Sequence, residues 1–299
     1  MHDFSNEAAR NGTLSLDATM QYYEALNRIL AGDVGPMRDI WSQAPDSILM
    51  GPVGGRQIGH PEILRIFARQ ARGARGGQVT PRELMVRLGA EFCYSVCIEH
   101  GEIATASGAT IPVNLRATNI LQIDEDQCHL VYHHTDAWPQ APRPEDPASE
   151  RFTMLEDDAP ERDILDILEQ VRLAMDRMAD GDIGPISDLW ATEEDVSLAC
   201  PAGGIQVGWD AVKAELRLFA KLNMRASFQF KDIIARSHHD LAYASYLISA
   251  PDAAIASLPQ PLESRATTIF HQEGDRWQVV HHHADLVPDM EKLAAPGRR

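Results

Sequence analysis

The chain has 299 residues, of which 44% are hydrophobic and 24% charged, and its formal net charge is −17 at pH 7. This composition is typical of a globular protein, and the length is enough for two ordinary domains. An acidic surface repels phosphate backbones, so we expect no nucleic-acid partner.

The cysteines and the apolar stretches indicate the cellular compartment in which the protein is expected. The four cysteines, Cys93, Cys97, Cys128 and Cys200, show neither metal-ligand spacing nor a disulfide framework, which favours core thiols in a reducing compartment. Residues 1–11 lack an apolar signal core, and no apolar stretch is long enough to cross a bilayer. We therefore expect a cytoplasmic protein with no membrane partner.

The second half of the chain repeats the first. Residues 279–285 (VVHHHAD) echo residues 130–136 (LVYHHTD) at an offset of 149 positions, and the same offset relates Arg116 to Arg265 and residues 32–33 to 181–182. The repeat predicts two copies of one domain, at 1–140 and 160–290. A proline-rich, acidic linker at 141–159 separates the copies.

Each copy begins with segments of helical pattern. After a loose leader at 1–16, a helix is expected from about 17 to 31, closed by Gly32, and its counterpart runs from about 160 to 180. Pro36 and Pro185 each start a short second helix. A short strand (47–50 and 196–199), a glycine-rich hairpin turn (52–59 and 201–208) and a third helix follow in each copy.

The rest of each copy is strand-like. Strands are predicted at about 82–89, 91–99, 113–123 and 127–134 in the first copy. In the second copy they fall at about 227–236, 240–249, 263–272 and 276–284. Three helices followed by antiparallel strands indicate an α+β fold, in which the helices cover one face of the sheet.

The motifs of the second copy resemble those of a known family. Residues 265–267 read Arg-Ala-Thr, and Trp277 begins a last strand that reaches His283 and Asp285. This pattern resembles the SnoaL-like branch of the nuclear-transport-factor-two-like superfamily. The resemblance implies a cone, in which a curved antiparallel sheet wraps around N-terminal helices and leaves an apolar pocket. It also implies cofactor-free acid–base chemistry, or simple binding and oligomerisation. The first copy departs from the pattern, with Cys128 in place of the tryptophan.

The terminal strands hold the histidines that we expect to carry the chemistry. On a regular strand alternate residues share a face, so His281 and His283 lie with Trp277 and Val279. This set is the more apolar, which predicts that His134 and His283 point into the pocket as general acid or base. His133 and His282 are predicted on the other face.

Further candidates surround these histidines. Tyr22 stands on the inward stripe of the first helix and is either a core residue or a pocket hydroxyl. Asp136 and Asp285 are candidates to fix a histidine tautomer. Arg116 and Arg265 either bind an anionic part of the ligand or form ion pairs with these aspartates. The remaining candidate substrate contacts are Tyr132, His281, His60, Tyr94 and Trp41, of which His60 is alternatively a surface residue and Trp41 a core anchor.

These observations favour a cofactor-independent acid–base enzyme of the lyase, dehydratase or isomerase class that acts on a small aromatic or polycyclic molecule. No bound cofactor or metal is predicted. One alternative is a non-catalytic module that binds small molecules or oligomerises. Another is a metal enzyme that uses His281, His283 and a third ligand. Besides its small-molecule substrate, the chain is expected to form a pseudo-dimer of its own two copies, and to associate further as a homo-oligomer.

Overall fold

The computed structural model describes residues 4–105, 108–124, 127–137, 162–201, 203–253 and 262–286. The chain divides into two compact units, domain 1 (Met1–Leu155) and domain 2 (Glu156–Arg299). The predicted linker at 141–159 lies outside the described residues.

Domain 1 has three helices and six strands. The helices are α1 (Phe4–Leu30), α2 (Gly35–Ile40) and α3 (His60–Gly73). The strands are β1 (Ile48–Gly51), β2 (Gly54–Ile58), β3 (Gly77–Leu88), β4 (Phe92–Ala104), β5 (Thr110–Asp124) and β6 (Gln127–Ala137). Helix α1 starts at Phe4, so the prediction of a loose leader is wrong for residues 4–16.

Domain 2 repeats this order. Its helices are α4 (Arg162–Ala179), α5 (Gly184–Leu189) and α6 (Trp209–Lys221). Its strands are β7 (Ser197–Ala199), β8 (Gln206–Val207), β9 (Gln229–His238), β10 (Leu241–Ala250), β11 (Leu262–Glu273) and β12 (Arg276–Leu286). Gly32 and Gly181, which follow α1 and α4, have φ of 92° and 95°, the left-handed conformation that commonly ends a helix.

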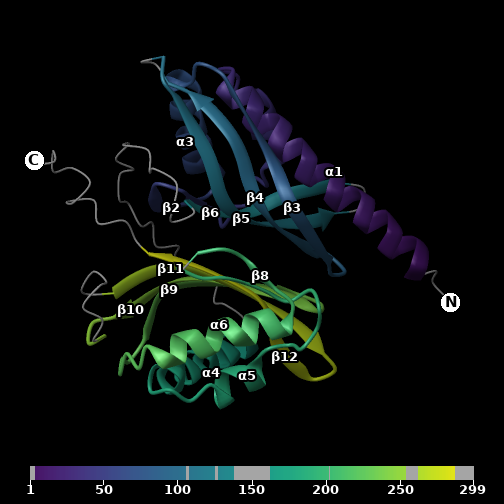
Figure 1. Ribbon diagram of the computed structural model, residues 1–299. Helices are drawn as coiled ribbons and strands as arrows, with labels where there is room; N and C mark the ends of the chain where they lie inside the picture. Colours follow the sequence, from purple (N-terminus) through teal and green to yellow (C-terminus); the bar gives the residue numbers. More distant parts are fainter. Residues whose placement is uncertain are drawn as a thin grey trace, which may run out of the picture. The chain divides into compact units, whose positions relative to one another are not determined.

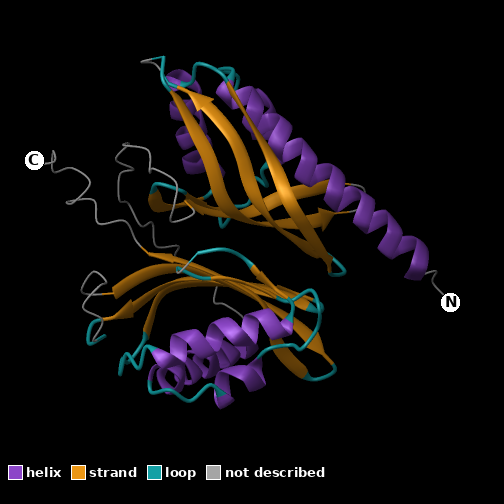
Figure 2. Ribbon diagram, viewed as in Figure 1, coloured by secondary structure: helices purple, strands orange, loops and turns teal. Residues whose placement is uncertain are grey.

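Each domain has one six-stranded sheet, with the order β2-β1-β6-β5-β4-β3 in domain 1 and β8-β7-β12-β11-β10-β9 in domain 2. All neighbouring strands are antiparallel except β1 with β6 and β7 with β12. The sheets are strongly curved, and the helices of each domain lie on one face of its sheet (Figures 1 and 2). The predicted α+β fold of two tandem cones is thereby confirmed. We call the helix-covered face of each sheet the inner face and the opposite face the outer face.

The first helix of each domain supplies the centre of the core on the inner face. In α4 an apolar stripe at helical spacing is buried, including Ile164, Leu168, Val171 and Met178. In α1, Tyr22 and Ile29 take the corresponding places and join a core that includes Trp41, Phe67 and Cys97. The sheets curve around these helices because their inner faces bury apolar side chains against the same stripe.

Candidate functional site

The terminal strands each contain a bulge that changes which histidine faces inward. Ile120 pairs with Tyr132 while Leu121 pairs with Leu130, so Val131 is an extra residue in β6. A bulge shifts the alternation of the side chains beyond it by one residue. His133, opposite Asn119, therefore lies on the inner face and His134 on the outer face.

Domain 2 has the same bulge at the equivalent place. Ile269 pairs with His281 and Phe270 with Val279, which leaves Val280 as the extra residue. His282 lines an internal cavity, and His283 lies on the outer face. The prediction that His134 and His283 point into the pockets, with His133 and His282 turned away, is therefore wrong in both domains.

Arg116 and Arg265 form buried ion pairs on the outer faces. Nε of Arg116 donates to Oδ1 of Asp136 at 2.9 Å, and Nη2 donates to Oδ2 at 2.5 Å. Arg265 contacts Asp285 in the same bidentate way, at 3.0 and 2.8 Å. The guanidinium fork matches a carboxylate and ties two neighbouring strands together. The geometry supports the ion-pair alternative, because both aspartates are bonded to arginines on the face opposite the helices.

Other predicted contacts also lie on the outer faces. The Tyr132 hydroxyl lies 4.0 Å from Sδ of Met50, and Nδ1 of His281 lies 2.8 Å from Oγ of Ser197. Tyr94 pairs with Ile120 on this side of the sheet and is fully buried. The prediction that Tyr132 and His281 face the pocket is wrong, because the bulges at Val131 and Val280 reverse the alternation of the side chains beyond them.

Two predicted residues do lie on the inner face of domain 1, and one lies away from it. Tyr22 and Trp41 are 2% and 1% exposed and belong to the core. His60 begins α3, where Nε2 lies 3.2 Å from the carbonyl oxygen of Arg38 and the side chain is partly exposed. His60 therefore has the surface position that was its alternative.

Domain 2 contains a cavity of about 300 Å³ between its three helices and the inner face of its sheet. Most of the wall is aliphatic or aromatic, and it includes Met175, Met178, Trp190, Phe219, Phe228 and Ile248. In the part of the chain that the structure describes, no Asp, Glu, Lys or Arg lines this cavity. Since a cavity of about 150 Å³ can hold benzene, this one has room for a ligand of two or three rings.

His282 contributes an imidazole to the cavity wall, a group that can accept or donate a proton. Its Nδ1 lies 2.9 Å from Oγ1 of Thr268, which lies 2.7 Å from the hydroxyl of Tyr246. The threonine hydroxyl has one proton, which it donates either to Nδ1 or to Tyr246. His282 therefore holds its own proton on Nε2 in the first case and on Nδ1 in the second.

The environment of His282 keeps its ring neutral. Burial lowers the pKa of His282 to about 4, and His283 beside it contributes to the same shift. Among the residues that the structure describes, Nε2 of His282 has no hydrogen-bond partner. Nε2 is thus available to accept a proton from a ligand or to donate one to it.

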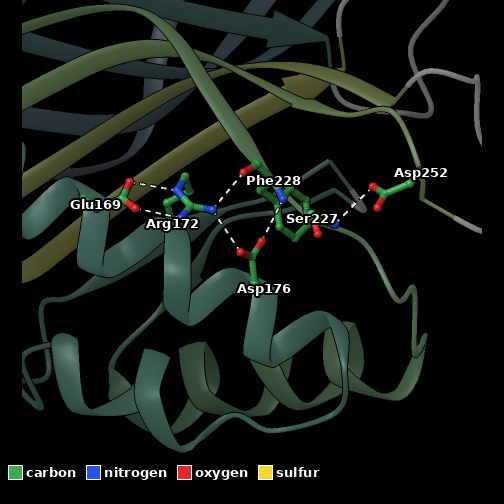
Figure 3. Close-up of polar contacts among 6 residues, drawn as sticks. All are labelled: Glu169, Arg172, Asp176, Ser227, Phe228 and Asp252. Atoms are coloured by element: carbon green, nitrogen blue, oxygen red, sulfur yellow. Dashed lines mark hydrogen bonds and ion pairs between the residues drawn. The ribbon is translucent and has the colours of Figure 1, made fainter.

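One side of the cavity is held by an ionic network on α4 (Figure 3). The backbone N–H of Phe228 donates to Oδ1 of Asp176 at 2.7 Å, and Nη1 of Arg172 donates to the Phe228 carbonyl at 3.1 Å. Arg172 also contacts Glu169 and Asp176. The network fixes the backbone of Phe228, whose side chain lines the cavity.

The interior of domain 1 is more polar at the equivalent place. The hydroxyl of Tyr22 lies 3.2 Å from Nε2 of His133, and Nδ1 of His133 lies 2.6 Å from Oδ1 of Asn119. The amide of Asn119 in turn donates to Oγ of Ser95 at 3.1 Å. Both ring nitrogens of His133 therefore have partners within the protein.

Glu99 is the acidic member of this interior. It is 2% exposed, and burial raises the pKa of its carboxyl to about 7, against the opposing effect of hydrogen bonds from Tyr23 and Thr135. The hydroxyl of Tyr23 also lies 3.0 Å from Sγ of Cys97. Domain 2 has Ile248 at the position of Glu99, so this group belongs to domain 1 alone.

The sequence carried weak signals for the residues that were misplaced or missed. Val131 and Val280 each follow another apolar residue, which interrupts the polar–apolar alternation of the strand. Such a doublet is compatible with a bulge, but it does not locate one. Glu99 ends the apolar run of β4, where an acidic side chain marks a position that must be either exposed or functional.

The chain belongs to the SnoaL-like domain family, which matches residues 16–136 and again residues 167–289. The predicted resemblance is thereby confirmed in both copies. No curated protein matches the chain. No helix in the described ranges has both the length and the apolar character needed to cross a membrane.

Several solved structures are similar to single domains of the chain. A putative dehydratase of the NTF2-like family from Streptomyces avermitilis is 19% identical, with a TM-score of 0.38, over 42% of this chain and 95% of its own. An NTF2-like protein of unknown function from Pseudomonas putida KT2440 is 25% identical, with a TM-score of 0.37, over 46% and 93%. A ketosteroid isomerase-like protein from Erwinia carotovora atroseptica is 16% identical, with a TM-score of 0.36, over 42% and 94%.

Proposed function

We propose that domain 2 binds a small organic molecule in its cavity and that His282 moves a proton on that molecule without a cofactor. The observation that supports this proposal is the setting of His282. Its Nδ1 is held by Thr268, and its Nε2 has no partner among the described residues. The described part of the surrounding cavity wall contains no Asp, Glu, Lys or Arg.

The environment of His282 favours reactions in which a proton leaves the ligand and then returns. An imidazolium ion in an apolar cavity is costly, as the lowered pKa of His282 shows. That cost falls when an enolate or similar anion forms beside the ring at the same moment. Isomerisation, elimination and hydration have this character, and they belong to the lyase, dehydratase and isomerase classes.

Hydrogen exchange on a carbon acid tests this proposal without knowledge of the natural substrate. The full chain is incubated in D₂O with 2-tetralone, an uncharged bicyclic ketone, and loss of the α-hydrogens is followed by NMR. We expect the wild type to accelerate exchange, and we expect His282→Gln to lower the protein-dependent rate at least about a hundredfold. His133→Gln changes the equivalent residue of domain 1 and should keep the wild-type rate. Equal rates for wild type and His282→Gln would contradict the proposal.

A non-catalytic binding module is the second candidate, and the largely apolar wall of the cavity favours it. In that case 2-tetralone raises the melting temperature of the wild type by mass action. Exchange of its α-hydrogens then stays at the rate of buffer alone. Melting and exchange measured on the same samples separate the two functions.

A further inference from the structure

The two inward-facing histidines occupy equivalent places, but their neighbours differ. At the offset of 149 residues, His133 corresponds to His282 and Tyr22 corresponds to Val171. In domain 1 the phenol ring of Tyr22 packs against His133, with ring centroids 5.0 Å apart and planes at 42°. In domain 2 Val171 and His282 both line the cavity. The larger side chain thus fills a place in domain 1 that a smaller one leaves open in domain 2.

The hydrogen bonds of domain 1 define how the phenol meets the imidazole. The amide oxygen of Asn119 only accepts, so Nδ1 of His133, 2.6 Å away, donates to it. Nε2 of the neutral ring is then an acceptor, and the Tyr22 hydroxyl at 3.2 Å donates to it. Burial, with Glu99 and Cys97 nearby, raises the pKa of Tyr22 well above 10, so the phenol keeps the proton that it donates.

We propose that Tyr22 is an internal copy of the ligand of domain 2, and that the cavity binds an uncharged phenol whose hydroxyl meets Nε2 of His282. This inference rests on the proposed function, because it takes the domain 2 cavity as the functional site. Val171 leaves the space, and Nε2 of His282 lacks the partner that Tyr22 gives to His133.

The charge of the cavity selects the neutral form of the ligand. Among the described residues that line the cavity there is no Asp, Glu, Lys or Arg, and Arg265 is bonded to Asp285 on the outer face. A phenolate or carboxylate would meet no cationic side chain among the described lining residues, so burial disfavours the anion strongly. A neutral phenol instead buries its ring and forms one hydrogen bond.

Three bicyclic probes of similar size separate the effects of ring burial, the hydrogen bond and ligand charge on affinity. Isothermal titration of the full chain with 2-naphthol, naphthalene and 2-naphthoate compares a phenol, a hydrocarbon and an anion. We expect 2-naphthol to bind once per chain, with an affinity about tenfold above that of naphthalene and well above that of 2-naphthoate. His282→Gln should lower the affinity for 2-naphthol about tenfold and leave that for naphthalene nearly unchanged.

Exchanging the side chains at positions 22 and 171 tests whether Tyr22 occupies the place of the ligand. Val171→Tyr places a phenol in domain 2 and should abolish 2-naphthol binding. Tyr22→Val should create a second 2-naphthol site in domain 1, so that the full chain binds two molecules. If Tyr22→Val fails to fold, Val171→Tyr and the probe series still decide.

Several results would overturn the proposal. The proposal fails if the wild type does not bind 2-naphthol, or if it binds 2-naphthoate as tightly as 2-naphthol. It also fails if His282→Gln leaves the affinity for 2-naphthol unchanged, or if Val171→Tyr still binds 2-naphthol. Each of these results concerns binding of a phenol, whereas the exchange of α-hydrogens of 2-tetralone measures proton transfer by His282. Failure of the phenol assignment is therefore distinguishable from failure of proton transfer by His282.

Discussion

Oε1 of Glu99 lies 3.9 Å from Nε2 of His133 in the interior of domain 1, where both side chains are 2–3% exposed. This carboxyl oxygen has no hydrogen-bond partner among the described residues. Burial removes water from the carboxyl and disfavours its ionised form, which raises the pKa of Glu99 to about 7. Domain 1 thus keeps a proton that an exposed glutamate would lose at lower pH.

Glu99 should make domain 1 less stable as the pH rises. The pKa is about 7 in the folded state against 4.5 for an ordinary glutamate in the unfolded chain, so stability falls as the pH rises from 4.5 to 7. The full cost above pH 7 is about 3 kcal/mol at 1.36 kcal/mol per pKa unit. Glu99→Gln should remove this cost, so it stabilises domain 1 at pH 8 and changes little at pH 4.5.

Urea unfolding at several pH values measures this effect. Glu102→Gln is the matched control, because Glu102 is an exposed residue of the same strand. Its stability should follow that of the wild type at every pH. A Glu99→Gln profile parallel to the wild-type profile would show that Glu99 ionises normally in the folded protein.

His282 should give domain 2 the opposite pH dependence. Its pKa is about 4 in the folded state against 6.5 for an ordinary histidine in the unfolded chain. Its contribution is therefore fully present above pH 6.5 and is lost as the pH falls through 4. The loss amounts to about 3 kcal/mol, by the same conversion of pKa units. In His282→Gln, the free energy of unfolding of domain 2 should fall less between pH 6.5 and pH 4, the acid limb of its pH profile.

NMR titration of the imidazole protons checks the same prediction directly. The His282 signals should titrate near pH 4. His271→Gln should leave the acid limb of domain 2 intact. A His282 midpoint near 6.5 would contradict the buried, neutral ring on which the proposed function depends.

The fold could be predicted from the sequence because its signals repeat. The apolar stripe of α4, the glycines after the first helices and the strand pattern each occur twice at one offset. Each of these signals depends on neighbours only a few residues away. The repeat also placed Tyr22 correctly, since Val171 stands on a clear apolar stripe.

The site could not be predicted in the same way, because it depends on pairing between strands. Val131 and Val280 are unpaired extra residues only in relation to β5 and β11. One extra residue exchanges the faces of every later side chain, so alternation pointed to His134 and His283. The ionisation of Glu99 likewise depends on burial by α1, which is far from β4 in sequence.

Arg172 should stabilise the cavity of domain 2 by holding the backbone of Phe228. Arg172→Met removes the bond to the Phe228 carbonyl and the contacts to Glu169 and Asp176 (Figure 3). We expect a loss of about 1–2 kcal/mol in the unfolding free energy of domain 2, together with weaker binding of 2-naphthol. Thermal and urea unfolding measure the first effect, and calorimetry measures the second.

Arg177→Met is the matched control for Arg172→Met. Arg177 lies on the same helix and contacts Asp182, but the two side chains are 63% and 44% exposed. Solvent screens an exposed pair of this kind, so Arg177→Met should lower the stability of domain 2 less than Arg172→Met does. Equal losses for the two variants would show that the bond to Phe228 adds nothing to stability.

The ion pair of Arg116 and Asp136 should be structural rather than a ligand contact. Both side chains are buried, so Arg116→Met removes the cation that faces the buried Asp136 carboxylate and should cost about 3–5 kcal/mol of domain 1 stability. The double variant Arg116→Met, Asp136→Leu removes both charges and should regain most of the loss. Arg28→Met breaks the exposed pair with Asp33 and should cost much less, because solvent screens an exposed pair. A double variant as unstable as the single one would show that Arg116 stabilises the sheet through contacts other than Asp136.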